Sequence, residues 1–163
     1  MPLFRPQELP SFSRLGWLMG LYADNHQRIA RMLDLGRFDQ PGIWISSCGD
    51  GLDVVIEVLE VHAYTLELRI SYQLCDPVTG QPDPSAYVRI YRDARQAEVT
   101  HCYIGRHWQD VLGLHPSPKV MFGHRLRMNS FLNKWLEYLL GQGHGPGTVQ
   151  PLEAADEESV AFA

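Results

Sequence analysis

Apolar and polar side chains alternate most regularly between Leu66 and Leu74. The even-numbered residues of this stretch are apolar or aromatic, whereas the odd-numbered ones are Glu67, Arg69, Ser71 and Gln73. A period of two indicates a β-strand with one buried side and one solvent-facing side. Because one-sided burial is typical of antiparallel sheets, the pattern predicts an antiparallel rather than a parallel sheet.

A second alternating stretch, Tyr87–Val99, predicts a β-hairpin. Val88 and Ile90 alternate with polar or aromatic neighbours, and the alternation resumes at Ala97 after a short turn. We expect the second strand of this hairpin to run to about Tyr103.

Two further strands complete the predicted sheet, and a loop precedes the hairpin. Ile43–Cys48 and Leu52–Val61 are apolar enough for strands, and the Gly-Asp-Gly turn at residues 49–51 separates them. Asp76–Ser85 contains three prolines and one glycine, which predicts a loop.

Apolar residues three or four positions apart predict a helix at each end of the chain. The first helix is expected from about Ser13, with Ser11 or Ser13 as its N-cap and Gly36 at its end. The second is expected from about Gly123 to Gly141 or Gly143.

These elements predict an α+β domain: an antiparallel sheet of about five strands with both helices packed on one face. Residues 13–141 form this single domain in our interpretation, after an irregular, proline-containing arm at residues 1–12. Residues 142–163 are rich in glycine and then in acidic side chains, so we expect a flexible acidic tail there.

Composition restricts the class of protein. The chain of 163 residues has a formal net charge of −5, which argues against nucleic-acid binding by bulk electrostatics. Its three cysteines are widely spaced and fit reduced thiols better than a disulfide framework. We find no signal peptide and no membrane-spanning segment in the sequence, and therefore expect a cytoplasmic protein without membrane contact.

Two separated motifs carry a family resemblance. They are Ile90-Tyr91-Arg92-Asp93-Ala94 with Ala97-Glu98-Val99, and Asn129-Ser130-Phe131-Leu132-Asn133-Lys134-Trp135-Leu136. In both the chain resembles the YqiB-like family, a proteobacterial domain of unknown function (1249). The resemblance implies no activity that could be carried over. Genes for a cyclic-nucleotide phosphodiesterase and a nucleotide-sugar hydrolase are often neighbours in this family, which implies a housekeeping or signalling context.

Asp93 and Glu98 are the first candidates for acid/base or metal chemistry. We favour a structural interpretation, because no nucleophile or glycine-rich loop lies beside them in the sequence. Asp93 would then accept backbone hydrogen bonds in the turn, and Glu98 would pair with Arg89 or Arg92 on the neighbouring strand.

A transition-metal site would have to be built from His101, His107, His115, His124 and Cys102. Their spacings match no recognised ligand pattern, so we expect neither a metal nor a cofactor.

Basic and aromatic residues are interleaved around the hairpin, as they are in sites that clamp phosphates and stack bases. The basic members are Arg89, Arg92, Arg95 and Arg106, and the aromatic members are Tyr87, Tyr91, Tyr103 and Trp108.

The sequence thus favours a small non-catalytic adaptor or regulator over an enzyme. We expect it to bind a protein partner, or to self-associate, through the exposed sheet face or an unpaired edge strand. An RNA- or nucleotide-binding module on the Arg/Tyr face is the alternative, and a hydrolase using Asp93, Glu98 and a histidine is a third. The candidate binding residues are Tyr87, Arg89, Tyr91, Arg92, Asp93, Arg95 and Glu98.

Overall fold

The computed structural model describes residues 9–49, 51–104 and 116–152. In chain order its elements are α1 (Leu9–Met32), the 3₁₀ turn η1 (Leu35–Arg37), β1 (Gly42–Ser46), β2 (Val54–Val61), β3 (Thr65–Tyr72), β4 (Ser85–Tyr91), β5 (Gln96–Tyr103), α3 (Pro118–Gln142), the 3₁₀ turn η2 (Pro146–Thr148) and β6 (Val149–Pro151).

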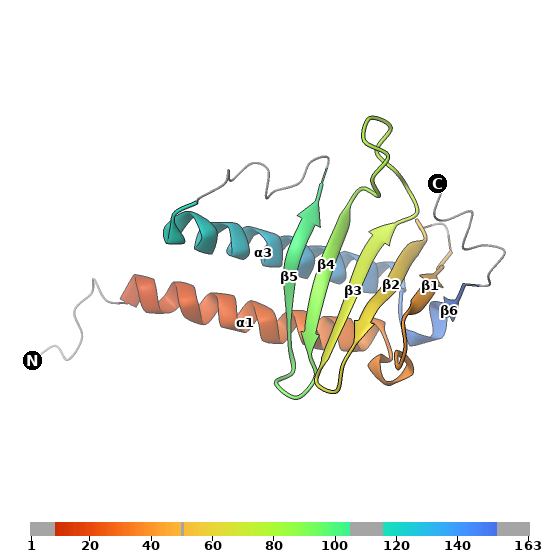
Figure 1. The fold of residues 1–163 in the computed structure, drawn as a ribbon, viewed down its shortest axis with the longest axis horizontal. Helices are drawn as coiled ribbons and strands as arrows, with labels where there is room; N and C mark the ends of the chain where they lie inside the picture. The colour runs from red at the N-terminus through yellow and green to blue at the C-terminus, as the bar shows by residue number, and fades with distance from the viewer. Residues whose placement is uncertain (1–8, 50, 105–115, 153–163) are drawn as a thin grey trace, which may run out of the picture.

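The strands form one antiparallel sheet in the order β5-β4-β3-β2-β1-β6. The two helices lie together on one face of this sheet and run in the same direction (Figure 1). The predicted α+β architecture is therefore confirmed, with six strands in place of about five. None of the described helices is long and apolar enough to cross a membrane.

The core lies between the sheet and the helices. It contains the side chains that the alternating sequence pattern predicts to face inward. Leu66, Leu68 and Ile70 of β3 are fully buried. They face Leu132 and Leu136 of α3 in the same hydrophobic cluster. The opposite side of the sheet, here called the outer face, is covered by none of the described helices (Figure 1).

The sixth strand corrects the predicted C-terminal boundary. Val149–Pro151 pairs with β1, and Val149 is buried. Arg37 donates from Nη1 to the carbonyl oxygens of Pro146 and Val149, both at 3.4 Å. The chain is thus folded up to Pro151, well into the tail expected from residue 142. Residues 153–163 lie outside the described part.

Both helices begin earlier than predicted. α1 starts at Leu9, so residues 9–12 belong to the helix rather than to an arm, and Ser11 and Ser13 lie inside it. α3 starts at Pro118, where proline suits the first helical turn because its missing N–H would be unpaired anyway. Ser117 caps α3, since its Oγ accepts the Val120 N–H at 3.3 Å.

The end of α3 agrees with the prediction. Gly143 follows the helix with φ of 105°, a left-handed conformation that glycine adopts without a side-chain clash.

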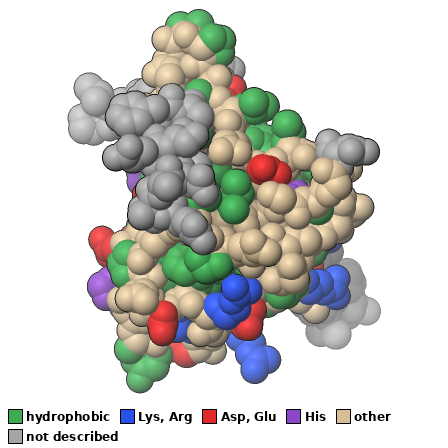
Figure 2. All heavy atoms as spheres, turned by 90° about the vertical axis from the view of Figure 1, so that its right-hand side faces the viewer, with side chains coloured by type: hydrophobic (Ala, Val, Ile, Leu, Met, Phe, Trp, Pro, Cys, Tyr) green, Lys and Arg blue, Asp and Glu red, His purple; other side chains and the backbone are tan. Residues whose placement is uncertain are grey.

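Hydrogen bonds connect the loop between β3 and β4 to β5. The Tyr103 hydroxyl donates to Asp76 Oδ2 at 2.8 Å, and Tyr103 also hydrogen-bonds the Thr79 hydroxyl. The backbone N–H of Val78, and next the Tyr103 hydroxyl, hold the pKa of Asp76 below its usual value. The loop projects from the top of the molecule, and hydrophobic side chains gather at its tip in Figure 2. Val78 in this loop is 90% exposed.

Candidate functional site

The outer face of the sheet brings together three of the predicted binding residues. Tyr87, Arg89 and Tyr91 alternate along β4 with Val88 and Ile90, which are buried in the core. The shared face predicted for these three residues is therefore present in the structure.

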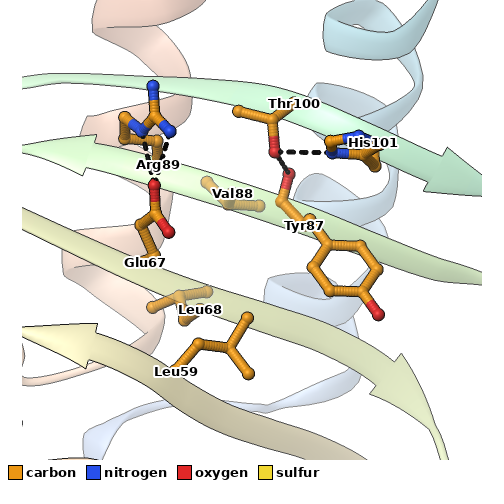
Figure 3. A pocket seen from close by; sticks show the side chains of 8 residues that line it. All are labelled: Leu59, Glu67, Leu68, Tyr87, Val88, Arg89, Thr100 and His101. Carbon is orange, nitrogen blue, oxygen red and sulfur yellow. Dashed lines mark hydrogen bonds and ion pairs between the residues drawn. The ribbon is translucent and has the colours of Figure 1, made fainter.

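Arg89 pairs with a residue that the sequence analysis did not consider. Its guanidinium lies 2.6 Å from Glu67 Oε1 on β3, not against Glu98 on β5 (Figure 3). The hydrogen bond with Glu67 is the main cause that raises the pKa of Arg89. Glu98 instead accepts a hydrogen bond from the Tyr91 hydroxyl at 2.6 Å, so its predicted pairing with Arg89 or Arg92 is wrong.

A second ion pair repeats this arrangement on the same face. Arg69 Nη2 lies 2.6 Å from Glu57 Oε2, across the β2–β3 pairing. Its guanidinium carbon is also 5.9 Å from the centre of the Tyr87 ring, within the range of a cation–π contact. Both arginines of this part of the outer face are thus already matched by a carboxylate.

A hollow of about 370 Å³ opens on the outer face over β2, β3, β4 and β5. It is lined by Leu59, Glu67, Leu68, Tyr87, Val88, Arg89, Thr100 and His101. Figure 3 shows the Tyr87 and His101 side chains on neighbouring strands at one end and the Arg89–Glu67 pair at the other. The two rings meet edge to face with 5.9 Å between their centres. The Thr100 hydroxyl donates to the Tyr87 carbonyl at 3.4 Å.

A neighbouring hollow of about 310 Å³ lies between β5 and the first turns of α3. It shares Arg89, Thr100 and His101 with the first, so the two form one continuous surface around β5. Met121 and Met128 add apolar lining from α3, and Arg125 adds a cation. The combination of aliphatic, aromatic and hydrogen-bonding groups suits an amphipathic ligand.

Arg92 and Arg95 do not join the outer face. Arg92 donates from Nη2 to the carbonyl oxygen of Phe38 at 2.9 Å, which ties the hairpin to the segment after α1. Arg95 has φ of 52° in the β4–β5 turn and lies beside His26 of α1. Burial, followed by the charge of Arg95, lowers the pKa of His26. The predicted binding set is therefore divided between two sides of the molecule.

Asp93 is exposed in the same turn. Within the part of the chain that the structure describes, its carboxylate accepts none of the backbone hydrogen bonds that we expected. Arg106 and Trp108, the remaining members of the Arg/Tyr interpretation, lie outside the described residues.

The last-helix motif contains a buried polar network that the sequence analysis missed. Asn129 is fully buried, and its Oδ1 accepts the Val99 backbone N–H of β5 at 3.0 Å. Its own carbonyl accepts from Asn25 Nδ2 at 3.3 Å, and Asn133 donates to Asn25 Oδ1 at 3.0 Å. Two helices and the edge strand are thus joined by asparagines. Their clustering in the motif was the available signal.

A buried serine–histidine pair was also missed. Ser46 Oγ lies 2.7 Å from His144 Nδ1 and 2.7 Å from the Thr148 hydroxyl. Burial lowers the pKa of His144, while Asp53 opposes that shift. Ser46 is fully buried, so its hydroxyl cannot meet a substrate. We interpret the pair as a connection between β1 and the segment that leads into β6.

The histidine and cysteine candidates do not form a metal cluster where they can be placed. His107 and His115 lie outside the described residues, and the remainder of the described chain contains no group of three potential ligands. Cys102 is buried, and burial raises the pKa of its thiol to about 12. Burial also lowers the pKa of His124.

Comparison with known proteins places the chain in a family. A family model described as "Protein of unknown function (DUF1249)" matches residues 28–145, well over half of the chain. No curated protein and no solved structure gives a match. The matched region includes the hairpin motif and the last-helix motif that carried the resemblance. The chain therefore belongs to the DUF1249 family.

Proposed function

We propose that this protein is a non-catalytic, cytoplasmic adaptor or regulator of bacterial cells that binds a protein partner on the outer face of its sheet. The observation that carries the proposal is the pairing of Arg89 with Glu67 and of Arg69 with Glu57, both at 2.6 Å. This pairing leaves a charge-balanced surface with a hollow in it.

Charge balance favours a protein ligand over a nucleic acid. Nucleic-acid binding draws its affinity from cations that replace the counterions of phosphates. Arg69 and Arg89 would have to give up short contacts with carboxylates to do so. An exposed histidine and a half-buried tyrosine and leucine beside satisfied ion pairs resemble instead the mixed surface of a protein interface.

The carboxylates of the site also support binding rather than catalysis. Glu67 holds Arg89, and Glu98 accepts the hydrogen bond of the Tyr91 hydroxyl. Each carboxylate thus orients a neighbouring side chain and fixes the shape of the face, which is the preorganisation that a binding surface needs.

The face is a better contact surface than the β5 edge. In the middle of that strand, the outward N–H of Val99 already donates a hydrogen bond to Asn129 Oδ1. An added strand would have to break this buried hydrogen bond to pair along β5. We therefore place the partner on the outer face alone.

The test is an affinity capture from native cytosol with a matched pair of variants, with and without nuclease. Tyr87→Ala/His101→Ala removes both rings of the hollow. His62→Ala/Tyr64→Ala removes the same residue types from the β2–β3 turn, where Tyr64 is 66% exposed. We expect a nuclease-resistant protein that is lost only with the first variant. Recovery of RNA instead would support the alternative module, and equal capture by both variants would refute the proposed face.

A further inference from the structure

The helical layer is longer than the sheet is wide. In Figure 1 the first halves of α1 and α3 extend past β5, the last strand on that side. We call this part, Arg14–Ala23 of α1 with Pro118–Arg127 of α3, the helix overhang. It has a small core of its own: Leu18, Leu21 and Leu126 cluster there, apart from the main core.

The overhang exposes large apolar side chains. Leu15 is 53% exposed, Trp17 60%, Met19 44% and Val120 44%. Residues on a helix are about 100° apart, which puts Leu15 and Met19 on one flank of α1 and Trp17 on the opposite flank. A flat membrane surface could not reach both flanks together, whereas a flexible polypeptide can wrap around them.

The overhang is also cationic in an acidic protein. It carries Arg14, Lys119, Arg125 and Arg127, and neither segment contains an aspartate or glutamate. The next acidic residue is Asp24 after the α1 segment and Glu137 after the α3 segment. Arg125 Nη1 lies 3.9 Å from Glu98 Oε2. The other three basic residues form no ion pair with any carboxylate of the described chain. The N-termini of both helices point to this end, and their dipoles add to the positive potential.

One segment of the same chain has the complementary composition. Glu153, Asp156, Glu157 and Glu158 place four of the 19 acidic residues within six positions, and Val160 and Phe162 follow. Carboxylates followed by apolar side chains match a surface of cations and exposed apolar groups.

The acidic residues of the same molecule do not reach the far end of the overhang. Leu152 lies beside Ile43 of β1, since its N–H donates to the Ile43 carbonyl at 2.9 Å. The six strands put about 24 Å between the β6 edge and β5, at ~4.8 Å for each spacing. Asp156–Glu158 come at most six residues after Leu152, a reach of about 21 Å. Lys119 lies in the first turn of α3, at the end of the helix that extends past β5.

We infer that the helix overhang binds the acidic C-terminal segment, residues 153–163, of a second copy of this chain. The inference is independent of the proposed partner on the outer face. None of the residues that line the first hollow belongs to the overhang, and the neighbouring hollow shares Met121, His124 and Arg125 with it.

The first experiment is sedimentation velocity of the full chain, of a chain truncated after Leu152, and of two charge-reversal variants. Lys119→Glu/Arg127→Glu reverses two exposed charges of the overhang. Arg31→Glu/Lys134→Glu reverses two exposed charges of the same helices outside it. We expect concentration-dependent association of the full chain, weakened about tenfold or more by the truncation and by the first variant but not by the second.

A peptide of residues 153–163 then tests the contact directly. It should bind the truncated chain, and about tenfold more weakly after Lys119→Glu/Arg127→Glu. A monomeric full chain with no peptide binding would overturn the inference. So would association that survives truncation, or association that nuclease abolishes, which would assign the overhang to nucleic acid.

Discussion

Asn129 and Val99 join the last helix to the edge of the sheet: the Oδ1 atom of the buried asparagine accepts the outward-facing N–H of β5 at 3.0 Å. An edge strand normally leaves such amides open to other chains. Here the Asn129 side chain satisfies the amide in the middle of β5, so a further strand would have to break this hydrogen bond to pair there.

Replacement of Asn129 tests how much this hydrogen bond contributes to stability. Asn129→Ala leaves the Val99 N–H without its acceptor and creates a small cavity, so we expect a loss of about 2–3 kcal/mol in the free energy of unfolding. Urea denaturation measures it. Ser130→Ala, next to it on α3 and only partly buried, serves as the control. An Asn129→Ala protein as stable as the control would contradict this role.

Stability should fall as the pH drops below neutrality. Burial is the main cause that lowers the pKa of His26, His124 and His144 in the folded state. The unfolded chain then binds more protons than the folded one, so stability is complete above an unfolded pKa of about 6.5 and declines below it. Each histidine contributes a slope of up to about 1.4 kcal/mol per pH unit.

Denaturation midpoints between pH 8 and pH 5 measure this dependence. His144→Gln should flatten it, because the amide keeps a hydrogen-bonding group near Ser46 without titrating. A free energy of unfolding that rose toward pH 5 would contradict the predicted direction of the pH dependence.

The Arg89–Glu67 pair should organise the outer face more than it stabilises the fold. The Arg89 side chain is 43% exposed, so solvent screens the interaction. A double-mutant cycle with Arg89→Met and Glu67→Gln should give a coupling of about 0.5–1 kcal/mol. A coupling indistinguishable from zero would mean that the two side chains do not hold each other in solution.

The cysteines should differ in reactivity. Cys102 is buried and its pKa is raised to about 12, whereas Cys48 and Cys75 are partly exposed. Only the thiolate reacts with alkylating reagents. We expect iodoacetamide to label Cys48 and Cys75 in the native protein and Cys102 only after unfolding, as peptide mass spectrometry would show. Native labelling of Cys102 at a similar rate would contradict its burial.

The sequence predicted the elements in which a periodic pattern of apolar residues continues over many positions. The alternation along β3 and the hairpin located three strands within a few residues, and the apolar spacing located both helices. β6 has only three residues, one of them proline, and no period can be recognised in so short a strand. The start of α3 at Pro118, ahead of the predicted start near Gly123, follows from the fit of proline to the first helical position.

The candidate site was predictable only in part. Alternation was enough to put Tyr87, Arg89 and Tyr91 on one face. The strand order places two carboxylates opposite Arg89, Glu67 on β3 and Glu98 on β5. Sequence alone does not rank the two. The contact of Arg92 with Phe38 depends on a tertiary approach that no local pattern encodes.

The measurement that tests the central claim most directly is site-specific photo-crosslinking from the outer face. A photoreactive residue at position 101, inside the hollow, is compared in cells with the same residue at position 62 in the β2–β3 turn. The account predicts a discrete protein adduct from position 101 that is absent from position 62. Crosslinking of RNA at position 101, or no difference between the two positions, would contradict it.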